Sequence, residues 1–220
     1  MDAAGAQGGK ASTENARSIA RFDSAPRFEV LDREHRDRQS LERFIADTYT
    51  AAYGAHVTHY AEHLVALRHS GRGWDAGLGY TLGGRNRLFV EQYLDEPVEA
   101  AISSALGATV ERNQIVEVGN LAAAGSGAAR RVIVRMTALL HELGRTWVVF
   151  TSTRALLNSF SRLNIATIDL GRADPSRLPD RGANWGSYYA TDPHVMTANI
   201  PLGFLHLKGA PNAAAPASLR

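Results

Sequence analysis

The chain contains no cysteine among its 220 residues. This absence excludes disulfide bonds, thiolate catalysis and zinc sites built from cysteine. The sequence also lacks any apolar run near the roughly 18–20 residues that a membrane-spanning helix needs. Its first residues show no basic segment followed by an apolar one, which a secretory signal would require. We therefore expect a cytoplasmic protein with no transmembrane segment.

An excess of charge of either sign is also lacking. The sequence has 24 basic and 22 acidic residues, for a formal net charge of +2. This balance argues against nucleic acid as the main partner. With 45% hydrophobic and 21% charged residues, the composition is that of an ordinary globular protein. A chain of this length buries roughly 70% of its unfolded surface and needs no metal or disulfide for stability.

The two ends differ in composition from the middle. Residues 1–26 are rich in Ala, Gly, Ser, Asp and Arg, and residues 208–220 are rich in Ala and Pro. Neither segment has enough apolar content to offset the entropy of ordering it, so we predict two disordered tails. The prediction leaves a single domain over residues 27–207.

Hydrophobic periodicity within that domain predicts an α/β protein with a mixed sheet. Helices are expected over residues 41–52, 98–105 and 132–143, with a fourth after a cap at Ser152 or Thr153. Strands or extended segments are expected over residues 28–31, 63–67, 76–82, 88–93, 114–121, 146–151, 165–170, 186–189 and 195–204. The strand–helix–strand–helix–strand order after residue 114 predicts parallel pairing with right-handed crossovers.

One stretch suggests ligand chemistry. A strand containing Glu117 runs into small residues at positions 122–129 and then into a helix that carries Arg130 and Arg131. Small residues allow a ligand to approach the main chain, and the start of a helix offers unpaired N–H groups to an anion. The segment has neither a Gly-x-Gly-x-x-Gly pattern nor the lysine of a P-loop. A phosphate site and a tight turn without ligand remain alternatives.

The order of elements resembles the GNAT-type acyl-CoA N-acyltransferase fold, in which helices flank a central splayed mixed sheet. In that family the loop before the helix binds the CoA pyrophosphate, with the pattern Arg/Gln-x-x-Gly-x-Gly/Ala. The best register puts Gly127 and Ala129 on the small positions, and Ala124 on the Arg/Gln position. The next helix normally carries a Tyr that protonates the departing thiolate, and Phe160 occupies that position here.

Four motifs resemble the thermostable hemolysin family, which is similar in layout to GNAT acyltransferases and acyl-homoserine-lactone synthases. They are the segments FVEQYLDEPVE from residue 89, IVEVGNLA from residue 115, WVVFTSTR from residue 147 and WGSYY from residue 185. The resemblance implies an acyltransferase that uses acyl-CoA or an acyl carrier protein thioester as co-substrate, with no tightly bound cofactor. It implies a small amine as acyl acceptor.

The resemblance and the residue types together assign candidate roles. Glu117 is the candidate base, since an amine must lose a proton to attack a thioester; the alternative is a structural ion pair. Tyr188 or Tyr189 is the candidate replacement for the missing proton donor. Glu91 and Asn120 are expected to bind the acceptor. The alternative for Glu91 is a strand-end residue with no such role, and the alternative for Asn120 is a cap on the following loop. The residues expected to hold the thioester and its phosphates are Leu121, Ala123, Gly125, Ser126, Gly127, Ala128, Ala129, Arg130, Arg154 and Asn158.

Two other functions stay open at this stage. The family name suggests a membrane-acting toxin, but the sequence has no amphipathic segment beyond helices that are expected to face the core. A GNAT-like protein that binds a ligand without turnover is the other alternative. The spacing of His56, His59 and His63 resembles a metal site, but no acidic or cysteine partner is near, so we expect no bound metal.

Overall fold

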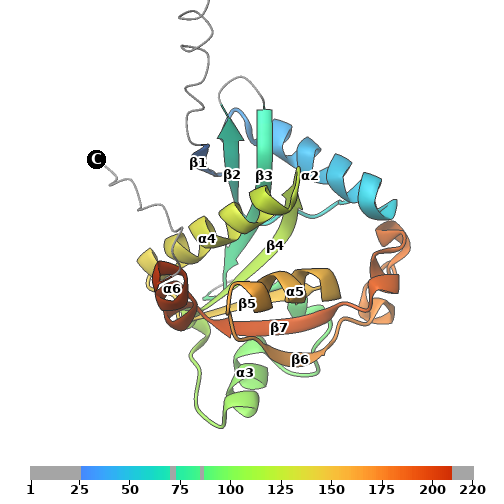
Figure 1. Cartoon of the computed structure of the whole chain (residues 1–220). Helices are drawn as coiled ribbons and strands as arrows, with labels where there is room; N and C mark the ends of the chain where they lie inside the picture. The colour runs from blue at the N-terminus through green and yellow to red at the C-terminus, as the bar shows by residue number, and fades with distance from the viewer. Residues whose placement is uncertain (1–25, 70–72, 85–86, 210–220) are drawn as a thin grey trace, which may run out of the picture.

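The computed structural model describes residues 26–69, 73–84 and 87–209. Nearly all of the two predicted tails lie outside these ranges, so those expectations stay predictions. The sequence SGRG at residues 70–73 predicts a turn, and most of it also lies outside the described residues. Within the described residues the chain forms seven strands and five helices (Figure 1). The strands are β1 (Arg27–Leu31), β2 (His63–His69), β3 (Gly73–Leu82), β4 (Ile115–Ala123), β5 (Trp147–Ser152), β6 (Ile168–Arg172) and β7 (His194–Asn199). The helices are α2 (Arg38–Tyr53), α3 (Val98–Leu106), α4 (Ser126–Glu142), α5 (Arg154–Arg162) and α6 (Ile200–Gly209).

All seven strands belong to one mixed sheet in the order β1-β2-β3-β4-β5-β7-β6. The predicted parallel pairing holds for β4 and β5. It fails for β5 and β6, because β7 lies between them and pairs antiparallel with both. The predicted α/β class and mixed sheet are confirmed. The strand next to β5 is β7, in the place where the predicted right-handed crossover would have put β6.

Several expected boundaries are wrong for local reasons. Residues 88–93 form a 3₁₀ turn over Phe89–Gln92 instead of a strand, because the Glu91 carboxylate accepts the N–H of Leu88 and closes the turn. The predicted strand at 186–189 is a 3₁₀ turn over Tyr188–Thr191.

The strand predicted over 195–204 ends at Asn199, and Pro201 stands in the first turn of α6, where its fixed φ favours a helix. The loop predicted to run to residue 129 ends at Gly125, since Ser126 and the alanines after it enter α4 directly.

Helices cover both faces of the sheet. Side chains of α4 pack with Val65, Leu78 and Val116 on one face, and α5 packs on Phe150 of the same face. On the other face α2 packs on Leu64 and Ala66, while α3 packs with Ile115, Val149 and Val195. Figure 1 shows α4 and α5 in front of the sheet. Because neighbouring strand residues point to opposite faces, β4 and β5 each contribute to two separate cores.

Arg38, at the start of α2, is an unusual buried charge at 8% exposure. Its guanidinium donates to the carbonyls of Ala61 (2.7 Å) and Glu62 (2.9 Å) and to Glu42 Oε1 (2.8 Å). These bonds fix the segment that enters β2 beside the candidate site. The guanidinium therefore connects α2 to that segment.

We expect Arg38→Met to lower the free energy of unfolding by about 3 kcal/mol, because it leaves two buried carbonyls and a carboxylate without their donor. Denaturant unfolding measures this loss. Arg33→Met at an exposed position is the control and should change stability by less than about 0.5 kcal/mol. Equal stability of the two variants would contradict the assigned role.

Candidate active site

The site begins where β4 and β5 part. Their pairing covers only three positions, from Ile115 with Trp147 to Glu117 with Val149. On its other side β4 has a bulge, since Gly77 pairs with Ala122 and Gly79 pairs with Gly119, so that two β4 residues face Leu78. A bulge bends a strand and re-aims its side chains. The bend turns β4 away from β5 just after Glu117 and opens the sheet there.

Asn120 is one of the two bulge residues and has a left-handed backbone (φ 54°). Asparagine tolerates this conformation better than most residues. Its side-chain Oδ1 accepts the N–H of Ala61 (3.1 Å), and its Nδ2 donates to the carbonyl of His59 (3.1 Å). The side chain therefore ties the bulge to the segment before β2. It lies at the junction of the two cavities described below.

Glu117 points to the face opposite Val116 and is 9% exposed. Its carboxylate accepts the main-chain N–H groups of Phe89 (2.6 Å) and Val90 (3.0 Å) in the 3₁₀ turn. Burial raises the pKa of the Glu117 carboxyl to about 7; the two amides counteract that rise, and the nearby Glu91 carboxylate adds to it. A carboxyl with this pKa is poised to accept a proton near neutral pH.

Glu91 lines neither of the two cavities described below. Its carboxylate accepts the N–H of Leu88 and of Val98 and forms a two-point ion pair with Arg112 (2.7 and 2.9 Å). Burial acts to raise the pKa of Glu91, but Arg112 and the two amides outweigh it and hold the pKa at about 2. All these partners belong to the protein, so Glu91 stabilises the turn that presents two amides to Glu117.

A pocket of about 90 Å³ lies next to Glu117. Six of its thirteen lining residues carry a ring, and several of these rings lie close to one another. The ring-bearing residues that line it are Tyr49, His59, Phe89, Tyr93, Trp185 and Tyr188. We call this space the ring pocket. Thr81, Thr151 and Asn120 add polar groups to its lining.

A second cavity of about 190 Å³ adjoins the ring pocket, and we call it the apolar cavity. It lies between α4, α5, α6 and the separated strands. Its aliphatic and aromatic lining comes mainly from Leu78, Val118, Leu121, Ile133, Met136, Leu140, Val148, Phe150, Leu156, Phe160, Ile165, Ala198 and Ile200. The two cavities share Tyr49, Val118, Gly119, Asn120, Thr151 and Tyr188. The opening between β4 and β5 therefore joins a polar, ring-lined space to a long apolar one.

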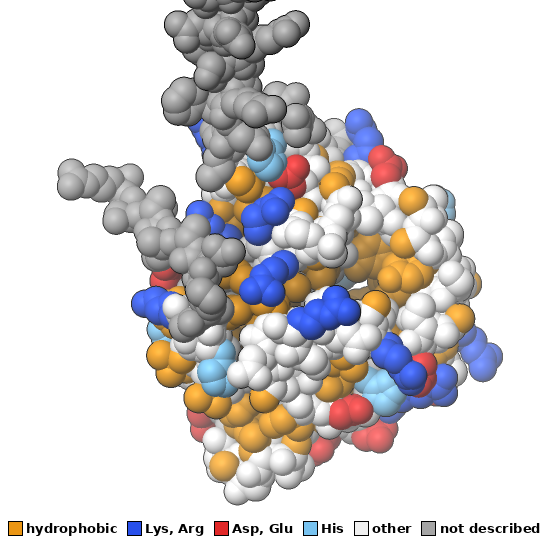
Figure 2. Space-filling model, in the orientation of Figure 1, with side chains coloured by type: hydrophobic (Ala, Val, Ile, Leu, Met, Phe, Trp, Pro, Cys, Tyr) orange, Lys and Arg blue, Asp and Glu red, His pale blue; other side chains and the backbone are white. Residues whose placement is uncertain are grey.

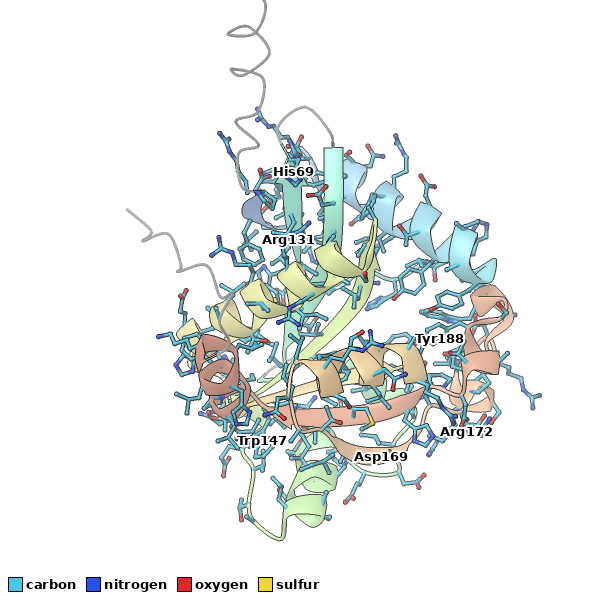
Figure 3. The ribbon with its side chains drawn as sticks, in the orientation of Figure 1. His69, Arg131, Trp147, Asp169, Arg172 and Tyr188 are labelled. Carbon is cyan, nitrogen blue, oxygen red and sulfur yellow. The ribbon has the colours of Figure 1, made fainter. Side chains whose placement is uncertain are left out.

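Tyr188 lies at the junction of the two cavities, whereas Tyr189 lines neither. Figure 3 places Tyr188 beside the end of α2, where the segment after β6 meets that helix. Burial raises the pKa of Tyr188 well above its usual value, so its hydroxyl keeps its proton at neutral pH. The Tyr189 hydroxyl is hydrogen-bonded to that of Tyr93 (2.6 Å).

The residues expected to bind phosphate lie outside both cavities, apart from Leu121. Within the described residues, the N–H groups of Gly125, Ser126 and Gly127 have no protein acceptor. Arg130 and Arg131 are exposed on the first turns of α4, and Arg154 and Asn158 are exposed on α5. Figure 2 shows Lys and Arg side chains gathered beside a hydrophobic hollow on this face, and Figure 3 shows Arg131 on α4.

Sequence reasoning missed most of the ring pocket. Tyr49 lies in the helix predicted over residues 41–52, and Phe89 and Trp185 lie in family motifs, but no pattern predicts a binding role for these three rings. These rings come together because three main-chain or side-chain hydrogen bonds join residues 184–187 to the end of α2. The density of aromatic residues at positions 185–189 was the available signal. His59 and His63, singled out for their spacing, stack on Phe89 and Tyr80 respectively.

Several solved structures have the same arrangement of elements. FeeM, an N-acyl amino acid synthase from uncultured soil microbes, matches with a TM-score of 0.55 at 15% identity, over 81% of this chain and 93% of that chain. The AHL synthase LasI matches with a TM-score of 0.58 at 11% identity, over 88% and 100%. BjaI, a CoA-dependent acyl-homoserine lactone synthase solved with SAM and isopentyl-CoA, matches with a TM-score of 0.56 at 13% identity, over 89% and 95%.

The sheet that opens after Glu117, with helices on both faces, thus has the GNAT-like acyltransferase fold, as the order of elements predicted. The chain belongs to the thermostable hemolysin family, whose sequence profile matches residues 31–204. A search of curated proteins gives no significant sequence match. Among the described residues, no helix has both the length and the apolar character needed to span a membrane.

Proposed function

We propose that the chain is an N-acyltransferase that moves an acyl group from an acyl-CoA or acyl carrier protein thioester to a small amine. The observation that supports this most strongly is the junction at Asn120 and Tyr188, where the apolar cavity meets the ring pocket beside Glu117. A thioester needs an apolar space for its acyl chain and a polar space for the attacking amine. The two cavities supply both spaces next to each other.

Glu117 is the proposed base. It takes a proton from the acceptor ammonium, and the free amine attacks the thioester carbonyl to form the C–N bond. The C–S bond then breaks, and the thiolate takes a proton from the Tyr188 hydroxyl or from water. Tyr188 recovers its proton from the new amide nitrogen or solvent. Phe160 packs on Phe150 and has no proton to give, whereas Tyr188 is a phenol that lines both cavities, as Tyr49 also does.

The main chain of β4 is the proposed oxyanion site. Beyond Glu117 the described part of β4 forms no pairing with β5, so main-chain groups on that side are open to a ligand. We assign the thioester carbonyl to N–H groups near Leu121 and Ala123. The pyrophosphate of CoA would bind the free N–H groups of Gly125, Ser126 and Gly127, with Ala128 and Ala129 in the following turn. Arg130 and Arg154 would add charge, and Asn158 would bond the pantetheine amide.

The test measures thiol release from a panel of acyl-CoAs of increasing chain length with candidate amines. We expect turnover with at least one medium or long acyl chain and little with acetyl-CoA, because a short chain leaves most of the apolar cavity unfilled. CoA binding without product would instead support the non-catalytic alternative. Prompt dye release from liposomes by the substrate-free protein would support the lytic alternative.

Gly203 provides a test of where the acyl chain lies. It lines the apolar cavity from α6, and a Cβ at this position would make ordinary contacts with Thr137 (3.8 Å) and Ile165 (4.0 Å). We expect Gly203→Leu to reduce kcat/KM for the longest accepted acyl-CoA by about tenfold, while shorter donors are spared. Gly203→Ala is the matched control, and it should keep the wild-type profile. An unchanged chain-length profile in Gly203→Leu would place the acyl chain elsewhere.

A further inference from the structure

The wall of the ring pocket suits a cation. Neighbouring rings lie close together, with centroid distances of 5.7 Å for His59 and Phe89, 6.2 Å for Phe89 and Trp185, and 5.4 Å for Trp185 and Tyr188. The faces of aromatic rings attract ammonium groups, and the attraction grows when water is excluded. The same rings also offer a flat apolar surface to the body of a ligand. The pocket therefore favours a ligand that is both cationic and aromatic or apolar.

The described side chains that line the ring pocket carry negative charge and include no lysine or arginine. Glu117 is the single carboxylate among the described lining residues, and none of those residues is a lysine or an arginine. His59 is the one imidazole, stacked on Phe89. Arg112, which contacts the turn through Glu91, is paired with Glu91 and Glu99. A carboxylate on the ligand would therefore meet Glu117 without a guanidinium or ammonium group from this lining to offset the repulsion.

We propose that the acyl acceptor is a primary amine with an aromatic or apolar body and no carboxylate, so that free amino acids are poor acceptors. This inference rests on the proposed function. Two like charges about 6 Å apart, at the effective dielectric constant typical of protein sites, disfavour binding by about 100-fold. The ammonium group of a simple amine instead pairs with Glu117, and its body lies against the rings.

The experiment compares phenethylamine, phenylalanine and phenylalaninamide as acceptors, with one acyl-CoA as donor. These molecules share the ring and the amine, but only phenylalanine carries a carboxylate. We expect kcat/KM for phenethylamine to exceed that for phenylalanine by about 100-fold. Phenylalaninamide, which has the bulk of the amino acid without its charge, should recover at least about tenfold over phenylalanine. Phenylalanine within about threefold of phenethylamine would overturn the inference.

A binding measurement separates this inference from the proposed function. Trp185 lines the ring pocket, so at about pH 9, where Glu117 is ionised, its fluorescence should respond to phenethylamine at concentrations about 100-fold below those needed for phenylalanine. Trp185→Phe should abolish the response, and Trp74→Phe, distant from the pocket, should keep it. If no amine is acylated but this preference holds, the proposed function fails and the ligand class stands. Equal binding of the two molecules overturns the ligand class whatever the turnover.

Discussion

Glu117→Gln is expected to lower kcat/KM for acyl transfer by about 100- to 1,000-fold, the loss expected when a general base is removed. The amide side chain cannot take a proton from the acceptor, and its NH₂ group faces one of two main-chain N–H donors, at Phe89 or Val90. Thiol release with the best donor and amine measures the loss. Glu142→Gln, at an exposed position near the end of α4, should keep wild-type activity.

The pH dependence of kcat/KM for the wild type also tests whether Glu117 is the base. Because the pKa of Glu117 is raised to about 7, kcat/KM should fall as the pH drops below 7, and this fall should be absent in Glu117→Gln. A Glu117→Gln variant as active as the wild type would show that another group accepts the proton.

The free energy of unfolding should change with pH in the direction opposite to kcat/KM, so that it falls as the pH rises. A carboxyl whose pKa is raised in the folded state stabilises the fold when it is protonated. Its contribution is therefore full below pH 4.5, the ordinary pKa of a glutamate carboxyl, and is lost as the pH rises through about 7. The free energy of unfolding of the wild type should fall relative to that of Glu117→Gln by about 3 kcal/mol over this range. Denaturant unfolding of both proteins at pH 4.5 and pH 8 measures the fall. A pH-independent difference would mean that Glu117 titrates normally.

Gly186→Ala should destabilise the protein by about 3–4 kcal/mol. Gly186 has φ 50° and ψ −125°, which residues with a side chain rarely adopt, and a Cβ there would lie 2.1 Å from the carbonyl oxygen of Tyr53. That oxygen accepts the N–H of Ser187 (2.8 Å), so neither partner can shift without breaking the contact between residues 184–187 and α2. Trp185 and Tyr188 would move with the segment, and acyl transfer should fall as well.

The matched control for this substitution is Gly144→Ala. Gly144 also has a positive φ of 67°, but a Cβ there would meet nothing within 4 Å. The cost of a left-handed alanine alone is about 1 kcal/mol. Thermal or denaturant unfolding of both variants separates backbone strain from steric conflict. If the two substitutions cost the same, the close approach of Gly186 to Tyr53 does not contribute to stability.

The sequence predicted those parts of the fold that depend on local patterns. The helix predicted over residues 98–105 is observed over Val98–Leu106, and Thr153 caps α5 through its side chain. The strand that carries Glu117 and the helix after the small residues also follow directly from periodicity. The order of these elements carried the resemblance to the GNAT-type fold, and the four motifs carried the resemblance to the thermostable hemolysin family. These predictions succeeded because each signal lies within a few residues of the element that it controls.

The pocket could not be predicted in the same way, because its parts meet only in the folded chain. Tyr49 and Tyr188 are far apart in sequence, and their rings approach to 6.5 Å. The proton affinity of Glu117 depends on amides of residues 89 and 90, which a strand prediction for 88–93 would have placed differently. The position of β7 between β5 and β6 could not be predicted either, because local periodicity does not show which strands become neighbours in the sheet.

Because β7 lies between β5 and β6, the binding site can form only after β7 has been synthesised. Strand β5 has its edge on one side covered only by β7, and Ala198 of that strand lines the apolar cavity. A nascent chain that has not yet released residues 194–199 from the ribosome therefore exposes the edges of both β5 and β6. The binding site is therefore complete only once β7 has inserted between β5 and β6, and until then the edges of both strands are open to other pairing.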